Sequence, residues 1–173
     1  LGARAAVALV YDTEADRAVQ NLGTLAEEAA QRGLRIAFEF TAFTPLWNTL
    51  AGAVELLDTV GHPDLAIGLD ILHLVRSGGS AAEVAALPPG LVAHAQLCDG
   101  AHLEVTADYG DEAAGNRLVP GAGVFPLTDF LAALPAGIPL ELEVPQPANA
   151  QPAERIRRTM TAARELIFGH SQG

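Results

Sequence analysis

The stretch Leu65-Ala66-Ile67-Gly68-Leu69-Asp70-Ile71-Leu72-His73 begins as an apolar run and ends in an acid followed, three residues later, by an imidazole. A continuous apolar run of this length is typical of a strand that is buried on both faces, as in a parallel sheet. Three other strand-like runs also end in a polar residue that offers an oxygen donor, and these residues are Glu39, Gln96 and Glu143. The sequence therefore contains four predicted strands, each of which ends in a residue with an oxygen donor.

Composition limits the class of protein. With 173 residues, of which 50% are hydrophobic and 18% charged, the chain can bury a sizeable core, and we expect one domain over residues 1–173. A net charge of -11 with only 10 Lys and Arg residues argues against a nucleic-acid partner. No apolar run approaches the roughly 20 residues that cross a bilayer. The single Cys98 cannot form an intramolecular disulfide, so we expect a reducing cytoplasm.

In the first half of the sequence, segments whose apolar residues recur with the spacing of a helix lie between the apolar runs. The first strand, over residues 5–10, is expected to be buried on both faces. A helix is then predicted to begin with a capping box at Thr13 and Asp16. The second helix is expected to begin at Thr44-Pro45 and to end near Gly61.

The second half continues the alternation. A flexible turn is expected at 76–79, followed by a capping box at 80–83 that opens a short helix. Two more helices are predicted over 126–134 and 152–168. The segment 98–125 shows neither the helical nor the strand spacing of apolar residues, and it is long for a connection. These two features favour a functional loop that lies over the strand ends.

The alternation of strands and helices predicts a parallel sheet with right-handed crossovers. Tyr11-Asp12-Thr13 follows the first strand where a dinucleotide-binding sheet would have its glycine-rich loop. Polar residues at the C-terminal ends of strands are instead typical of barrel enzymes. We predict an α/β fold, the C-terminal five βα units of a (β/α)8 TIM barrel and an incomplete barrel in this chain. The chain lacks a Met start, so we expect its N-terminal strands to be missing, with unpaired edges at 5–10 and 139–144.

The four donors are three carboxylates and one amide oxygen, a hard set that suits Mn²⁺ or Mg²⁺, with Co²⁺ also allowed. Such an ion would polarise a hydroxy-carbonyl substrate and stabilise an enediolate. Glu39 and Glu143 are our candidates for acid and base. Glu141 is a competing ligand, and a packed or supporting role is favoured for His94. Asp99 is equally suited to orient a ligand or to cap a turn.

Five short motifs follow one another along nearly the whole chain: Ala37-Phe38-Glu39, Gly68-Leu69-Asp70-Ile71-Leu72-His73, Gln96-Leu97-Cys98-Asp99, Arg117-Leu118-Val119-Pro120-Gly121-Ala122-Gly123 and Leu142-Glu143-Val144-Pro145. Together they resemble the xylose isomerase-like TIM barrels. That superfamily includes sugar and sugar-phosphate isomerases and epimerases, hydroxypyruvate isomerase, inosose dehydratase and one class of 3-dehydroshikimate dehydratase.

The resemblance implies a metal site formed by Glu39, Asp70, Gln96 and Glu143. It also implies that His73 and Arg117 hold the oxygens of the substrate. Many members have His where this chain has Gln96, and an acid often stands in the middle of the loop that here reads Gly121-Ala122-Gly123. Taken singly, each acid could be a helix cap, His73 a core residue and Arg117 a solvated loop charge.

We therefore expect a metal-dependent isomerase or epimerase that acts on a sugar, a sugar phosphate or a similar small molecule by proton transfer. The alternative is a lyase of the 3-dehydroshikimate or inosose dehydratase kind, because the same proton abstraction can lead to loss of a hydroxyl group. A non-catalytic barrel fragment or binding module is the alternative from another class. The expected partner is a small-molecule substrate, and a homo-oligomer is left open.

Overall fold

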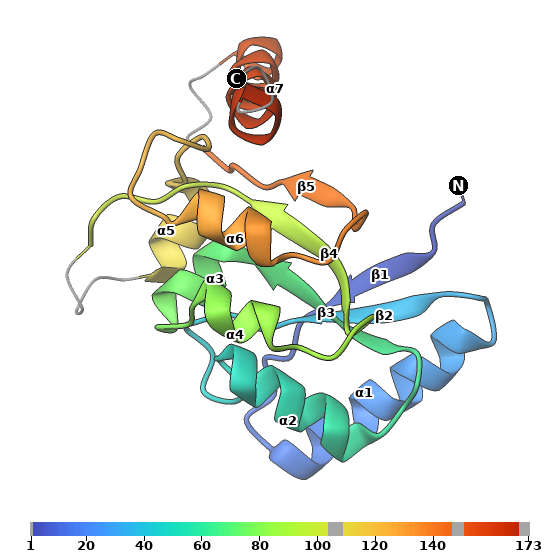
Figure 1. Ribbon diagram of the computed structural model, residues 1–173. Helices are drawn as coiled ribbons and strands as arrows, with labels where there is room; N and C mark the ends of the chain where they lie inside the picture. The colour runs from blue at the N-terminus through green and yellow to red at the C-terminus, as the bar shows by residue number, and fades with distance from the viewer. Residues whose placement is uncertain (1, 104–108, 147–150, 170–173) are drawn as a thin grey trace.

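The computed structural model describes residues 2–103, 109–146 and 151–169, and it centres on a five-stranded sheet (Figure 1). The strands are β1 (Ala5–Ala8), β2 (Arg35–Glu39), β3 (Leu65–Asp70), β4 (Val92–Leu97) and β5 (Leu140–Leu142). All neighbours pair in parallel, and the spatial order β1-β2-β3-β4-β5 equals the order in the sequence. Each connection thus returns to the adjacent strand, as in a (β/α)8 barrel. The prediction of five consecutive βα units from such a barrel is confirmed.

Helices follow the strands and cover one face of the sheet. They are α1 (Ala15–Ala30), α2 (Leu50–Val60), α3 (Ile71–Arg76), α4 (Ala81–Ala85), α5 (Tyr109–Gly115), α6 (Leu127–Ala133) and α7 (Pro152–Phe168). In Figure 1, α1, α2, α4 and α6 lie along the same side of the strands, α3 and α5 lie near the tips of the strand arrows, and α7 lies beyond β5. Among the described residues, no helix combines the length and the apolar character that a membrane span needs.

The core lies between the sheet and this helical layer. Every residue of β3 is buried, as the opening apolar run predicts. Leu22 on α1 and Leu56 on α2 belong to the same buried cluster as Ile67 and Leu69 of β3. Each such side chain contributes about 1.5–3 kcal/mol when it is fully buried. This packing fixes β3, and with it the position of Asp70.

The first strand differs from its prediction. Val7 and Leu9 are each 42% exposed, because β1 is an edge strand that pairs with β2 alone in the described sheet. The apolar run was therefore not a sign of burial on both faces. The expected edges at β1 and β5 are confirmed, and residues of these two strands and of β4 line a cavity of about 680 Å³.

Two helix starts were predicted wrongly. At α1, the Thr13 and Asp16 pair forms no capping box, since Glu14 is the N-cap residue and makes no side-chain cap. The carboxylate of Asp12 instead accepts the N–H of Glu14 at 2.9 Å and pairs with Arg17. These two local contacts of Asp12 thus take the place of the predicted capping box.

At α2, the helix does not begin at Thr44, whose hydroxyl donates to the carbonyl of Thr41 at 2.9 Å. Trp47 has a φ of 48°, a left-handed conformation that a right-handed helix cannot contain. The helix begins only after Thr49, whose side chain caps it, and it ends at Gly61 as predicted.

The described parts of the segment 98–125 contain more regular structure than the sequence suggests. It contains α5, and Asp99 forms an antiparallel bridge with Leu118 that folds the segment back on the end of β4. Residues 104–108 of the predicted loop lie outside the described ranges. The capping box at 80–83 and the helices α6 and α7 occur where they were expected.

Candidate active site

The structure brings all six predicted site residues to the C-terminal ends of the strands. They are Glu39 at the end of β2, Asp70 at the end of β3, His73 on α3, Gln96 near the end of β4, Arg117 after α5 and Glu143 after β5. Five of them are at most 6% exposed, whereas the side chain of Glu143 is 37% exposed. Parallel pairing produces this convergence, with Asp70 level with Gln96 in the register of β3 and β4.

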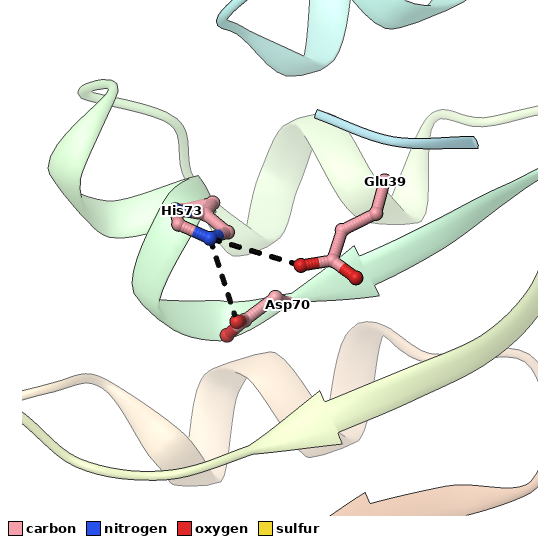
Figure 2. A group of neighbouring side chains, drawn as sticks. All are labelled: Glu39, Asp70 and His73. Atoms are coloured by element: carbon pink, nitrogen blue, oxygen red, sulfur yellow. Dashed lines mark ion pairs between the residues drawn. The ribbon is translucent and has the colours of Figure 1, made fainter. Parts of the chain in front are cut away.

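Two acids and an imidazole form the most buried part of the cluster. Figure 2 shows the ring of His73 facing the carboxylates of Glu39 and Asp70. Its Nε2 atom lies 3.7 Å from Glu39 Oε1 and 3.8 Å from Asp70 Oδ2. Each residue offers a ligand atom, and the three atoms lie within 4.8 Å of one another. The imidazole and the two carboxylates therefore face a common space at the ends of β2 and β3.

The protonation of His73 follows from its surroundings. Burial lowers the pKa of its imidazole to about 4, although the charge of Asp70 acts in the opposite direction. The ring is therefore neutral near pH 7. Its Nδ1 atom accepts the N–H of Ala42 at 3.4 Å, which leaves the ring proton on Nε2, toward the two acids. The ring of Phe43 stacks edgewise on this imidazole, with centroids 5.5 Å apart.

Arg117 links the acids of two strands. Its Nη1 donates to Asp70 Oδ2 at 2.6 Å, and its Nη2 lies 3.4 Å from Glu143 Oε1. The other carboxylate oxygen of Asp70 accepts the N–H of Leu72 at 2.8 Å and so caps α3. Arg117 is thus a buried site residue, and the reading of a solvated loop charge is wrong.

Gln96 provides the sharpest indication of a ligand. Its Nε2 donates to Glu143 Oε2 at 2.7 Å, while its buried Oε1 has no hydrogen-bond partner within the described parts of the chain. Buried polar atoms nearly always have a partner. An unpartnered amide oxygen whose own amide group contacts the carboxylate of Glu143 fits a divalent cation that prefers oxygen ligands. The residues present therefore fit the metal that the sequence implies.

The concentration of negative charge changes the acidity of the site. Burial raises the pKa of Glu39 to about 8, and the charges of Asp70 and Glu143 add to this effect. Burial also raises the pKa of Glu143. Arg117 opposes both shifts but does not cancel them. Glu39 thus holds a proton near neutral pH in the metal-free site, which a bound cation would displace.

Asp99 organises the loop that carries Arg117. Its carboxylate accepts four backbone N–H groups at 2.9 to 3.0 Å, from Gly100, Gly121, Gly123 and Phe125. A Cβ atom at Gly123 would lie 2.4 Å from Asp99 Oδ1, so this position requires glycine. Of its two predicted roles, the structure supports the capping of a turn.

Glu141 and His94 form a separate pair. Glu141 Oε2 lies 3.9 Å from His94 Nε2, and the Glu141 side chain is 59% exposed. Gly68 makes room for His94, because a Cβ atom there would lie 2.9 Å from its Cε1. Glu141 is therefore turned toward a neighbour on β4, and Glu143 is the acid that joins the cluster.

Sequence reasoning missed the contact between Arg76 and Glu112. Arg76 was expected in a flexible turn, yet its side chain is only 8% exposed and forms an ion pair of 2.6 Å with the buried Glu112. The two residues stand 36 positions apart. The only sequence signal is that Glu112 belongs to a segment too long for a simple connection.

Comparison with known proteins agrees with this fold. The sequence model of the xylose isomerase-like TIM barrel family matches residues 3–166. The chain is 35% identical over 127 residues to a 3-dehydroshikimate dehydratase of Pseudomonas aeruginosa, which covers 72% of this chain and 20% of that protein. It is 31% identical over 129 residues to a 3-dehydroshikimate dehydratase of Pseudomonas putida, covering 73% of this chain and again 20% of that protein. The chain thus spans about a fifth of the length of these curated relatives.

Solved structures show the same architecture. A xylose isomerase domain protein from Alicyclobacillus acidocaldarius aligns with a TM-score of 0.80 and 26% identity, over 96% of this chain and 65% of that chain. A crystal structure of the IOLI protein with a bound zinc atom aligns with a TM-score of 0.84 and 19% identity, over 96% and 64% of the two chains. The family model covers nearly the whole sequence and the sheet has the corresponding topology, so the chain belongs to the xylose isomerase-like TIM barrel family.

Proposed function

We propose that this chain carries the metal-binding and proton-transfer residues of an enzyme that acts on a small hydroxy-carbonyl compound. The observation that supports the proposal most is a network of contacts with an unpartnered amide oxygen. His73 lies between Glu39 and Asp70, Arg117 links Asp70 to Glu143, and Gln96 donates to Glu143, while the buried Oε1 of Gln96 lacks a partner among the described residues. Single acids at strand ends often cap helices. An unsatisfied amide oxygen in a network that contains three carboxylates is better explained by a cation.

These four residues would hold Mn²⁺, Mg²⁺ or a related divalent ion. When bound, such an ion acts as a Lewis acid that polarises a substrate carbonyl and eases loss of the proton on the neighbouring carbon. The hard oxygen donors suit this role better than a structural zinc site, which relies on Cys and His ligands.

Glu39 and Glu143 exchange protons with the substrate in this proposal. In the metal-free site burial raises the pKa of both carboxyl groups, to about 8 for Glu39, and carboxyl groups with a raised pKa are suited to general acid–base chemistry. Such groups contribute typically about 10²–10⁴-fold to the rate. Arg117 would hold a carboxylate or hydroxyl oxygen of the substrate, because its fork of N–H groups fits such oxygens. The neutral His73 would donate from Nε2 to another oxygen.

The favoured reaction is a dehydration of the 3-dehydroshikimate kind. Two curated relatives, at 35% and 31% identity, carry that name. A base removes the proton next to the carbonyl, the electron pair forms a carbon–carbon double bond, and the hydroxyl group one carbon further leaves with a proton as water. Glu39 and Glu143 are the two groups that would handle these protons.

Isomerisation or epimerisation of a sugar is the second candidate. It is favoured by the same pair of carboxyl groups, since one acid can remove a proton and the other can return it to a different carbon or face. The two reactions differ in their products, because dehydration forms a conjugated, ultraviolet-absorbing compound and isomerisation leaves the elemental composition unchanged.

The test uses the native full-length protein, its metal content and a panel of hydroxy-carbonyl substrates that includes 3-dehydroshikimate. Glu39→Gln and Glu143→Gln are compared with Glu141→Gln, a matched control that lies on β5 two residues before Glu143. We expect both site variants to lose turnover by at least about 100-fold, with metal content lowered, and the control to keep both. Retained metal and undiminished turnover in Glu39→Gln and Glu143→Gln would falsify the assigned roles.

A further inference from the structure

Arg76, the last residue of α3, forms an ion pair with the buried carboxylate of Glu112 on α5. Its Nε donates to Glu112 Oε2 at 2.6 Å and its Nη2 donates to Glu112 Oε1 at 2.7 Å. The Nη2 group also donates to the carbonyl of Ala101 at 2.7 Å. A two-point bond between a planar guanidinium and a carboxylate fixes the orientation of both groups. The position of α5 is thus tied to the end of α3.

Aromatic rings complete the environment of this guanidinium. Its carbon lies 4.8 Å from the ring centre of Phe125 and 5.6 Å from that of Tyr109. A Cβ atom at Gly100 would lie 2.3 Å from Phe125 Cζ and 2.7 Å from Glu112 Oε1. The packing leaves no space for a larger residue, so Glu112 has little freedom to move.

The helix α5 in turn holds Arg117. The residue after Glu112 is Ala113, whose carbonyl accepts Arg117 Nε at 3.1 Å. The same guanidinium then reaches Asp70 and Glu143 with its two Nη groups. Asp70 is the N-cap of α3 and Arg76 is the last residue of that helix. The contacts therefore run from the end of α3, through α5 and Arg117, back to the start of α3.

We infer that Arg76 is a positioning residue, which acts through Glu112 and α5 to hold Arg117 in the orientation that the site requires. This inference rests on the proposed function of Arg117 as a substrate contact. Buried ion pairs add little net stability compared with a well-packed apolar pair. Their directional hydrogen bonds do fix the orientation of the groups that they join. Here the bonds between Arg76 and Glu112 fix α5, and α5 orients the Arg117 guanidinium toward Asp70 and Glu143.

The experiment uses the native full-length protein with selectively ¹⁵N-labelled arginine. The exchange rate of the Arg117 Nε–H is measured by NMR, and its signal is assigned by its loss in Arg117→Lys. The test variants are Arg76→Met and Arg76→Lys. The second variant keeps a charge beside Glu112, so it folds even where an unpaired Glu112 is too costly, but it cannot reproduce the two-point bond. Arg32→Lys is the matched control, because Arg32 forms an exposed ion pair with Glu28 on α1.

We expect exchange of the Arg117 Nε–H to become at least about tenfold faster in Arg76→Met, with a smaller increase in Arg76→Lys and none in the control. KM for the substrate should rise about tenfold in Arg76→Met, and only marginally when the same change is added to Arg117→Met, because the two act through one contact. Unchanged Arg117 exchange in both Arg76 variants, with only thermal stability lowered, would overturn the inference. An inactive wild-type protein would count against the proposed function, while the exchange rates would still decide the role of Arg76.

Discussion

Removal of the Glu39 charge should make the metal-free protein more stable at alkaline pH. Burial raises the pKa of Glu39 from its ordinary value of 4.5 to about 8. A group whose pKa is raised on folding stabilises the folded state fully below pH 4.5, and this contribution is lost as the pH rises through 8. At about 1.4 kcal/mol for each pKa unit, the loss amounts to at most about 5 kcal/mol, since water that enters the site reduces it.

The assay is thermal and urea unfolding of the native full-length protein in the presence of a chelator, at several values between pH 5 and pH 9. Glu39→Gln keeps the shape of the protonated side chain but cannot ionise. We expect the variant to match the wild type at pH 5 and to exceed it at pH 9, with a melting temperature up to about 10–20 °C higher for a chain of this size. Glu28→Gln is the control, because Glu28 is an exposed acid on α1.

His73 contributes a pH dependence of the opposite sign. Burial lowers the pKa of its imidazole from 6.5 to about 4, so its stabilising contribution is present above pH 6.5 and is lost as the pH falls through 4. The difference between wild type and Glu39→Gln cancels this contribution, since His73 is present in both. If the two proteins show the same loss of stability between pH 5 and pH 9, to within about 1 kcal/mol, the reasoning about the buried carboxyl group is wrong.

Three other perturbations give sharp expectations. Titration of the metal-free protein with Mn²⁺ at pH 7 should release about one proton, because the pKa of Glu39 near 8 keeps its carboxyl group protonated. Calorimetry in buffers of different ionisation enthalpy measures the number of protons released, and the absence of proton release would contradict the raised pKa of Glu39. Asp99→Ala leaves four loop N–H groups without their acceptor, so urea unfolding should show a loss of about 3 kcal/mol, and a loss below about 1 kcal/mol would show that water replaces the carboxylate. Gly68→Ala would place a methyl group 2.9 Å from His94 Cε1 and should cost about 1–3 kcal/mol in the same assay, whereas an unchanged midpoint would mean that the imidazole moves aside freely.

The topology and the convergence of the site could be predicted because both depend on local patterns. An apolar run of the right length predicts a strand of a parallel sheet, and parallel strands bring their C-terminal ends to the same edge. Glu39, Asp70 and Gln96 needed only that rule, and the motif containing Arg117 was matched by its resemblance to the family. The roles of these residues in binding and catalysis stay predictions.

Features that depend on particular side-chain contacts or backbone conformations could not be predicted. The start of α1 was misplaced because Asp12 accepts the N–H of Glu14 and pairs with Arg17, which leaves the Thr13 and Asp16 pair unused. The start of α2 was misplaced because Trp47 has a left-handed conformation and the helix begins only after Thr49. Arg76 reads as part of a turn in the sequence, and only the fold brings it to Glu112, 36 positions away. A specific contact or conformation thus overrides the local signal.

The open sides of the sheet have a consequence for how this chain behaves in concentrated solution. A strand with an unsatisfied row of peptide groups is a template for another chain, and Val7 and Leu9 add apolar surface beside β1. The net charge of -11 makes identical molecules repel one another, and salt weakens that repulsion beyond about 8–10 Å at 0.1–0.15 M. A chain limited to residues 1–173 should therefore stay dispersed at low ionic strength and self-associate as salt is added, which light scattering can follow.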